Sequence, residues 1–199
     1  MVTDTISYDA KKMRELLLLV AERSVDDPNF GKTKLNKILY YIDFEAYGRF
    51  GRAVTGAEYQ RRPYGPVPRE ITEARQELVL HGDARVETTN RFGYPQGRLI
   101  AQRPAHTSVF SAEELELVGD VIAGLWHMTG AAVSEKSHRE PGWKIAEDGG
   151  TIPYGTVFLD SRRLTDDDIR RGQELHRLYG SSCQSHDLDQ AVSSSRPGA

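Results

Sequence analysis

Few stretches of this 199-residue chain carry residue types whose spacing suits chemistry. Gly31, Lys32 and Thr33 match the end of a phosphate-binding loop, in which backbone N–H groups and a lysine hold phosphate oxygens. The complete loop needs another glycine five residues before Gly31, but Asp26 stands there, and its carboxylate would repel a phosphate. We therefore interpret this stretch as the start of a helix.

Histidine and aspartate side chains are the other groups suited to metal binding. The six histidines are scattered, at positions 81, 106, 127, 138, 176 and 186, and no two are spaced i, i+4. A zinc site needs three or four converging ligands. The run Asp166-Asp167-Asp168 is interpreted as a helix start, where carboxylates face free backbone N–H groups. We accordingly expect no metal and no cofactor.

Nucleophilic catalysis has no support in the sequence. No Gly-x-Ser-x-Gly motif occurs, and Ser137 and His138 are adjacent, so that on a helix they do not face each other. We therefore expect that the chain is not an enzyme.

A proline-rich elbow, residues 61–68, offers side chains for contact with another protein. Its sequence, Arg61-Arg62-Pro63-Tyr64-Gly65-Pro66-Val67-Pro68, cannot continue a helix or a central strand, because proline lacks a backbone N–H. Two roles remain open. The elbow is either a rigid corner that docks the Tyr64 ring against the preceding helix, or a surface that a partner grips. Arg61 and Arg62 are interpreted as exposed charges beside it.

Trp143 and Lys144, which follow Pro141-Gly142, leave a similar choice. A loop tryptophan either covers the edge of the core or contacts a partner, since Trp, Tyr and Arg dominate the hot spots of protein interfaces. The candidate partner-binding residues are therefore Arg61, Arg62, Tyr64, Gly65, Pro66, Trp143 and Lys144.

The elbow follows a long apolar helix that begins near residue 32 and is expected to lie at the centre of the fold. One stripe at helical spacing contains Leu35, Ile38, Leu39, Ile42 and Ala46, and a second contains Tyr40, Phe44 and Tyr47. A helix apolar over so wide an arc needs neighbours on more than one side. Lys34, Lys37 and Glu45 are expected on the remaining, solvated face.

The other elements are mostly helical. Helices are predicted over 10–24 with Asp9 as N-cap, from a Thr33 cap to 48 or 51, from Pro66 or Pro68 to about 81, from a Ser111–Glu114 capping box, over 131–137, and from Thr165 to 180. Strands are predicted over 54–60, 84–89 and 98–102, and a strand or extended segment over 154–159. The expected fold class is α+β, mostly α: a compact helical domain with a small antiparallel β-hairpin.

Composition indicates one globular domain. Hydrophobic residues make up 38% and charged residues 28%, with a net charge of −3. We expect a loose N-terminus over 1–8, a single domain over 9–180 and a disordered tail over 181–199. The single cysteine, Cys183, and the lack of a signal peptide favour the cytoplasm, and the longest apolar run, residues 16–21, is too short to span a bilayer.

Three motifs, taken in order, resemble a known family. They are Lys32-Thr33-Lys34-Leu35-Asn36-Lys37-Ile38-Leu39-Tyr40-Tyr41, Gly51-Arg52-Ala53-Val54-Thr55-Gly56 and Tyr64-Gly65-Pro66-Val67-Pro68. Together with Phe110-Ser111-Ala112-Glu113-Glu114-Leu115, Glu140-Pro141-Gly142-Trp143-Lys144 and Ile152-Pro153-Tyr154, they are similar to the Panacea domain, the SocA-like antitoxins of bacteria and phages. The resemblance covers residues 10–160.

The resemblance implies a function that composition does not show. It implies an antitoxin that neutralises a cognate protein toxin, encoded by a neighbouring gene, by direct binding. One type of member is a proteolytic adaptor that delivers its toxin to a Clp protease, so a Clp-type protease is a further expected partner.

The alternative is a DNA-binding regulator of winged-helix type, with helix, helix and hairpin between residues 33 and 102. The net charge of −3 speaks against it, although residues 31–75 hold 9 Lys/Arg against 5 Asp/Glu and residues 111–175 hold 7 against 13. Weak binding to operator DNA remains open, and no contact with a membrane is expected.

Overall fold

The computed structural model describes residues 6–91, 94–159 and 170 of the chain. Its contacts divide the chain into two units, residues 1–160 and 161–199. The predicted helix from Thr165 to 180 and the predicted tail over 181–199 lie outside the described residues, apart from Arg170. The helices and strands named below belong to the first unit.

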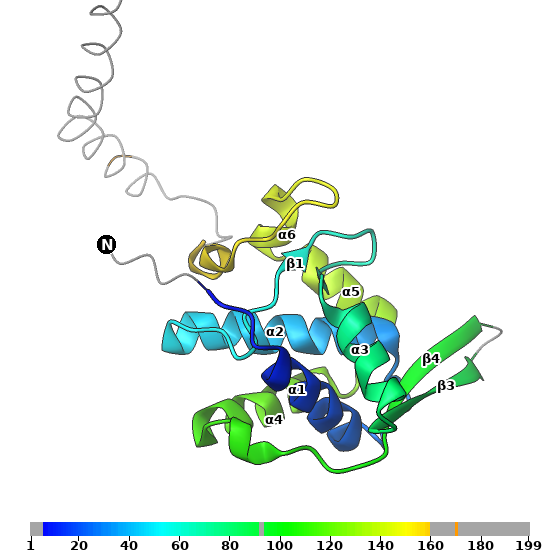
Figure 1. Cartoon of the computed structure of the whole chain (residues 1–199). Helices are drawn as coiled ribbons and strands as arrows, with labels where there is room; N and C mark the ends of the chain where they lie inside the picture. Colours follow the sequence, from blue (N-terminus) through cyan, green and yellow to red (C-terminus); the bar gives the residue numbers. More distant parts are fainter. Residues whose placement is uncertain (1–5, 92–93, 160–169, 171–199) are drawn as a thin grey trace, which may run out of the picture. The chain divides into compact units, whose positions relative to one another are not determined.

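Most of the first unit is helical, and its strands form two small antiparallel pairs (Figure 1). The elements, in order, are α1 (Ala10–Arg23), α2 (Lys32–Phe50), β1 (Tyr59–Gln60), β2 (Val67–Pro68), α3 (Ile71–Leu80), β3 (Ala84–Arg91), β4 (Tyr94–Ala101), η1 (Thr107–Val109), α4 (Ala112–Leu125), α5 (Gly130–His138), α6 (Pro141–Ile145) and η2 (Tyr154–Phe158). This confirms the predicted class, α+β with mostly helix.

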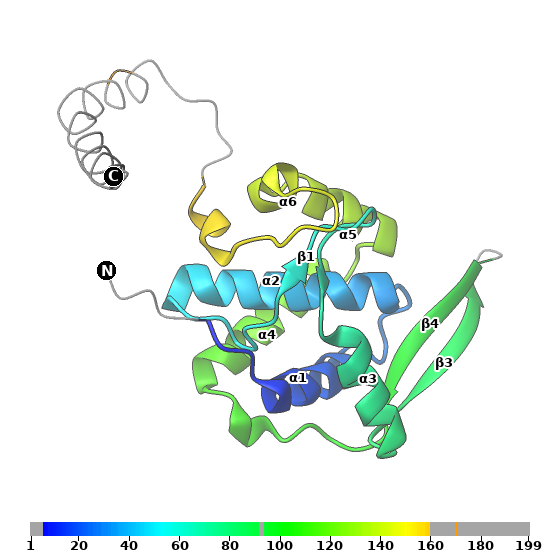
Figure 2. The same cartoon turned by 45° about the horizontal axis from the view of Figure 1, so that its top comes forward.

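Helix α2 lies at the centre, as its sequence predicts. It contacts α1, α4, α5, η2, β2 and β4 (Figures 1 and 2). The first predicted stripe is covered, since Leu35, Ile38, Leu39 and Ile42 are at most 1% exposed. In the second, Tyr40 and Phe44 are 3% exposed and Tyr47 is half-buried. The Phe44 ring lies 4.3 Å from Tyr40 and 4.6 Å from Tyr154, between ring centres, so an aromatic layer joins α2 to η2.

The expectation that Lys34 and Lys37 lie on a solvated face is wrong. Both side chains are buried, with 1% and 0% of their surface exposed. Lys34 Nζ lies 2.5 Å from Asp27 Oδ2 and donates to the carbonyl oxygens of Trp126 and Met128, so it ties the α4–α5 connection to α2. The first two turns of this central helix are therefore enclosed on the side where water was expected.

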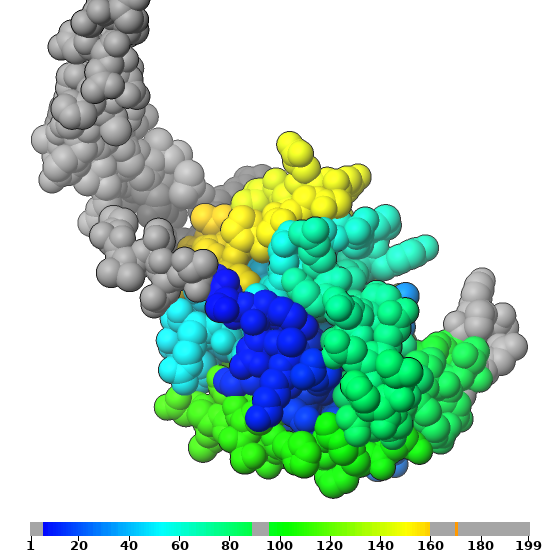
Figure 3. Space-filling view, in the orientation of Figure 1, coloured from blue at the N-terminus to red at the C-terminus, as the bar shows by residue number. Residues whose placement is uncertain are grey.

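Helix α1 is capped as predicted, because the Asp9 carboxylate accepts from the backbone N–H of Lys12 at 2.9 Å. The residues from Leu16 to Ala21 are all buried, so α1 is covered on every side over this stretch. Figure 3 shows α1 in blue beside α3 and above the green segment that leads into α4. The predicted Ser111–Glu114 capping box at the start of α4 is also confirmed.

The segment between α2 and the elbow is fixed by a buried carboxylate. Asp43 is fully buried and accepts hydrogen bonds from the Thr55 N–H at 2.7 Å, the Thr55 hydroxyl and the Tyr59 hydroxyl at 2.8 Å. Burial raises the pKa of Asp43, and these hydrogen bonds oppose the shift. The chain therefore leaves α2 along a defined path.

Several predicted boundaries differ from the observed ones. The strand predicted over 54–60 is limited to β1, and the helix after the elbow begins at Ile71 rather than at Pro66 or Pro68, because Val67 and Pro68 pair with β1. Helix α2 has Gly31 rather than Thr33 as N-cap. Residues 154–158 form a 3-10 helix instead of a strand, and the hairpin strands are longer than predicted.

No single helix in the described part of the chain is long and apolar enough to cross a membrane. Helices α4 and α5 reach that length and hydropathy only when taken together, across a bend of 109°.

Candidate functional site

The elbow follows β1 and ends in β2, and three hydrogen bonds fix the shape of its backbone. The Gly65 N–H donates to the Arg62 carbonyl at 2.8 Å, and the Ser134 hydroxyl of α5 donates to the Tyr64 carbonyl at 2.7 Å. Lys37 Nζ of α2 donates to the Pro66 carbonyl at 3.2 Å. The elbow is therefore held rigidly against α2 and α5.

Gly65 permits this close approach. Its φ is +94°, which L side chains rarely adopt, and a Cβ atom there would lie 2.3 Å from Ser137 Oγ and 2.6 Å from Lys37 Cε. Gly65 and Pro66 are both buried. These two candidate residues thus shape the site and offer no side chain to a partner.

Tyr64 does not behave as a docked corner residue. Its side chain is 76% exposed, although its carbonyl oxygen is held by the Ser134 hydroxyl. The interpretation of the elbow as a corner that docks this ring against α2 is therefore wrong. The ring stands on a fixed backbone, at the rim of a pocket.

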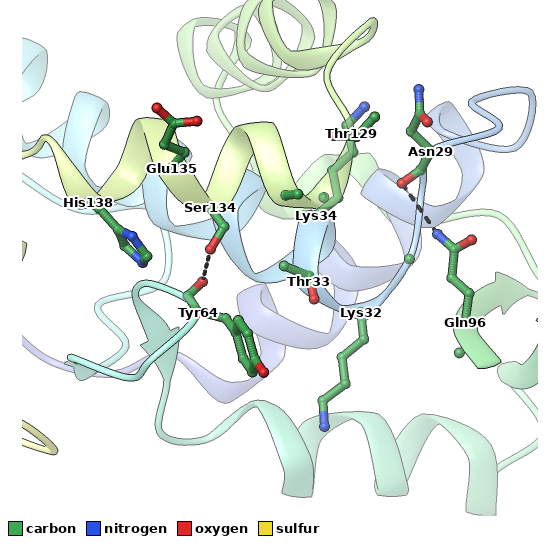
Figure 4. Close-up of a pocket in the computed structure, with 14 residues that line it drawn as sticks. Asn29, Lys32, Thr33, Lys34, Tyr64, Gln96, Thr129, Ser134, Glu135 and His138 are labelled. Atoms are coloured by element: carbon green, nitrogen blue, oxygen red, sulfur yellow. Dashed lines mark hydrogen bonds between the residues drawn. The ribbon is translucent and has the colours of Figure 1, made fainter. Parts of the chain in front are cut away.

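The pocket has a volume of about 860 Å³ and lies between the elbow, the start of α2, helix α5 and strand β4. Figure 4 shows Tyr64, Lys32, Thr33 and Ser134 around it. Gln96 closes the side toward β4, because its Nε2 donates to the Phe30 carbonyl at 3.1 Å. Its lining residues are Asn29, Gly31, Lys32, Thr33, Lys34, Tyr64, Gln96, Gly97, Thr129, Gly130, Ala131, Ser134, Glu135 and His138.

Trp143 of α6 supports the elbow through contacts with its first two residues. The indole N–H donates to the Arg62 carbonyl at 3.3 Å, and the ring stacks on His138 with centres 4.0 Å apart. Arg61 Cζ lies 4.2 Å from the Trp143 ring centre. Trp143 is half-buried, and these contacts stabilise the position of the elbow.

Arg61 is not the exposed charge that the sequence suggests. Its side chain is 24% exposed, donates to the Ala146 carbonyl at 2.7 Å and pairs with Asp148 at 3.1 Å. Arg62, by contrast, is exposed, and its side chain donates only to the Gln60 side chain within the described part of the chain. Lys144 is exposed on α6. The structure therefore brings Arg61, Arg62, Tyr64 and Trp143 together but gives them different tasks.

Two titratable groups lie behind the exposed rim. Burial lowers the pKa of Lys37 from 10.5 to about 8, and no carboxylate among the described residues pairs with it. Burial, together with the charges of Lys37 and Arg61, also lowers the pKa of His138. His138 Nε2 has no hydrogen-bond partner among the described residues. Two groups that can carry positive charge thus lie behind Tyr64.

Lys32, Thr33, Gln96 and His138 were not among the candidate residues from the sequence. The one signal for the first two was the Gly31-Lys32-Thr33 match, which marks a helix start as predicted and also lines the pocket. Within residues 6–91 and 94–159, no three His, Cys, Asp or Glu side chains gather closely enough to hold a metal ion.

Fold and site together define a mostly helical α+β domain that presents an exposed tyrosine on a rigid proline elbow. Residues 35–144, more than half of the chain, match the family described as "Antitoxin SocA-like, Panacea domain". The chain belongs to this antitoxin family, which confirms the resemblance. No curated protein and no solved structure matches the chain in the corresponding comparisons.

Proposed function

We propose that this antitoxin-family protein neutralises a cognate protein toxin by binding it directly, with the elbow and the pocket rim as the contact surface. The observation that carries the proposal is the 76% exposure of Tyr64 on a backbone fixed by Ser134, Lys37 and the Arg62 carbonyl. An exposed tyrosine on a rigid backbone binds at a low entropic cost, because little ordering remains to be done on association.

The surroundings of Tyr64 suit a protein partner. The pocket of about 860 Å³ beside the ring accommodates a side chain or a short peptide segment of the toxin. Lys32 lines the pocket and is exposed, and Arg62 is exposed on the elbow two residues before Tyr64, so an acidic segment of the toxin is favoured there. Under this proposal the protein acts by binding rather than by catalysis, in the cytoplasm, where a chain with one cysteine needs no disulfide.

The winged-helix alternative gains no support from α3, the helix that precedes the hairpin. Its exposed residues are Thr72, Glu73, Gln76, Val79 and Leu80, and none is basic. A recognition helix that enters the groove of DNA carries lysine or arginine on its exposed face. We therefore favour the toxin as the partner.

The test is co-expression with the neighbouring reading frame. We expect that the neighbour stops bacterial growth, that this protein restores it, and that the two proteins co-purify. Tyr64→Ala should weaken rescue and co-purification without lowering the melting temperature, because the ring is exposed. Phe158→Ala is the matched control, since Phe158 is an aromatic residue of η2 that is 66% exposed, and this variant should rescue like the unchanged protein.

If the neighbouring reading frame does not stop growth, the proposal is contradicted. If Tyr64→Ala rescues growth fully, the interface lies elsewhere on the molecule. The amount of toxin separates the two modes of neutralisation. If the protein acts as an adaptor for a Clp-type protease, the toxin level falls on co-expression and recovers in cells that lack the protease. Direct blocking leaves the toxin level unchanged.

A further inference from the structure

The hairpin of β3 and β4 has one covered edge and one open edge. β4 is tied to the α1–α2 connection, because Arg98 donates to the Ser24 carbonyl at 2.8 Å and Gln96 to the Phe30 carbonyl at 3.1 Å. In Figures 1 and 2, β3 lies on the outer side of the hairpin. Within the described part of the chain, β3 pairs with β4 alone. An unpaired strand edge is a ready template for another strand.

The hydrogen-bond pattern identifies which residues of β3 face outward. In an antiparallel pair, residues that exchange hydrogen bonds alternate with residues that do not. The Gln102 N–H donates to the Asp83 carbonyl at 2.8 Å, one position before the Ala84–Ala101 pair. The alternation therefore directs the N–H and C=O groups of Arg85 and Glu87 toward β4. Those of Val86 and Thr88 point away from it.

These outward groups are free within the described residues. No hydrogen bond there involves the backbone of Val86 or Thr88 outside the β3–β4 pair. The side chains around them are exposed as well: Val86 is 46% exposed, and the side chains of Arg85 and Glu87, which pair with each other at 2.8 Å in the single chain, are 55% and 44% exposed. β4 differs, since Pro95 has no N–H and Leu99 is buried. The free edge is therefore a property of β3.

The sequence around Val86 is complementary to itself in an antiparallel arrangement. If a two-fold axis passes beside Val86, this residue faces Val86 of a second copy, and both offer outward N–H and C=O groups. Arg85 then lies opposite Glu87 of the second copy, and Glu87 opposite its Arg85. Opposite charges in such cross-strand positions stabilise a sheet, and like charges destabilise it.

Neighbouring registers lack this complementarity. An axis beside Arg85 places two arginines opposite each other, and an axis beside Glu87 places two glutamates opposite each other. A shift of the axis by half a residue brings the outward groups of Val86 against residues whose polar groups point to β4, so that no ladder forms. Among the registers centred from Arg85 to Glu87, charge and hydrogen bonding together therefore select the one centred on Val86.

We propose that a second copy of this chain pairs with the free edge of β3, antiparallel and centred on Val86, and that the two hairpins form one four-stranded sheet. The interface is isologous, as expected for a symmetric dimer. Because it rests on one short strand from each copy, the dimer should dissociate on dilution. The proposal does not depend on how the protein binds a toxin.

The test is analytical ultracentrifugation of the whole chain and its variants over a series of concentrations. The unchanged protein should show a monomer–dimer equilibrium. Arg85→Glu and Glu87→Arg should each weaken association about tenfold, because each sets like charges opposite one another twice. An equimolar mixture of the two variants should associate again, since the two glutamates of one chain would then face the two arginines of the other.

Val86→Pro tests whether the backbone of β3 forms the hydrogen bonds of the dimer. It removes an outward N–H that does not bond to β4, so the hairpin should form and the melting temperature should stay unchanged, while the dimer is lost. Arg139→Glu is the control, because Arg139 is exposed at the end of α5 and should leave association unchanged. A chain that stays monomeric at every concentration would overturn the proposal, as would a mixture that associates no better than its components. Loss of toxin binding in Val86→Pro, with a monomeric unchanged protein, would assign the edge to the toxin instead.

Discussion

Lys37 lies fully buried in α2 and donates to the Pro66 carbonyl at 3.2 Å, so the core helix and the proline elbow are joined through an ammonium group without a carboxylate partner among the described residues. Burial lowers the pKa of this amine from 10.5 to about 8. Burial disfavours the charged form of this amine, because the ammonium loses its hydration and gains only the Pro66 carbonyl as an acceptor among the described residues. The elbow is thus attached by a contact whose strength depends on pH.

The pKa of Lys37 predicts how stability changes with pH. Between pH 8 and 10 the unfolded chain binds a proton at Lys37 that the folded chain has largely lost, so Lys37 contributes a rise of about 2 kcal/mol to the free energy of unfolding over this interval. Buried tyrosines such as Tyr59 and Tyr154 oppose this rise near pH 10, because burial raises their pKa and they keep protons that the unfolded chain loses. Lys37→Met should abolish this part of the pH dependence. Urea unfolding of both proteins at pH 7 to 10 measures the difference, and parallel curves would contradict the assignment.

Gly65→Ala should destabilise the protein for two separate reasons. A Cβ atom would overlap Ser137 Oγ and Lys37 Cε, and alanine is strained at a φ of +94°. We expect a loss of about 2–4 kcal/mol in the free energy of unfolding.

Gly149→Ala separates these two effects. Gly149 has a φ of +75° but no heavy atom within 4 Å of its Cβ position, so only the backbone strain of about 1 kcal/mol should appear. Thermal unfolding of both variants checks the comparison. Equal losses would mean that the elbow yields to the added methyl group.

Asp27→Asn should be among the more damaging changes to a charged residue. It leaves the buried Lys34 ammonium without its carboxylate at 2.5 Å, and breaking one side of such a pair costs about 3–5 kcal/mol. Glu135→Ala removes a pair of equal length, to Arg139, but both side chains there are at least 70% exposed, so the loss should stay below about 1 kcal/mol. Chemical denaturation measures both, and a mild effect of Asp27→Asn would mean that the Trp126 and Met128 carbonyls suffice for Lys34.

Lys34 also shows where prediction from the sequence ends. The periodicity of apolar residues predicts the central position of α2, and local signals predict the caps at Asp9 and at Ser111 with Glu114. A buried lysine has no such signal, because its acceptors at Trp126 and Met128 lie 92 and 94 positions away. The sequence therefore predicts elements and their apolar faces better than polar contacts between distant segments.

The site illustrates the same limit. The composition of the elbow identifies Arg62 as a surface candidate, but it leaves open whether the Tyr64 ring is docked or exposed, and it gives no sign that Arg61 is tied to Ala146 and Asp148. The pocket combines four segments from residues 29–34, 64, 96–97 and 129–138, which only the tertiary fold brings together. Residue types can suggest a surface, whereas its shape depends on packing.

The two neighbouring arginines of the elbow should respond differently to reversal of charge. Arg61→Glu loses the hydrogen bond to the Ala146 carbonyl and the contact with the Trp143 ring, so we expect a destabilisation of about 1–3 kcal/mol. Arg62→Glu affects an exposed side chain and should change stability by less than about 0.5 kcal/mol. If the rim binds an acidic segment of the toxin, Arg62→Glu should nevertheless weaken co-purification. Melting temperatures and toxin binding, measured for each variant separately, distinguish the two roles, and a stable Arg61→Glu protein would show that the elbow keeps its position without the Arg61 contacts.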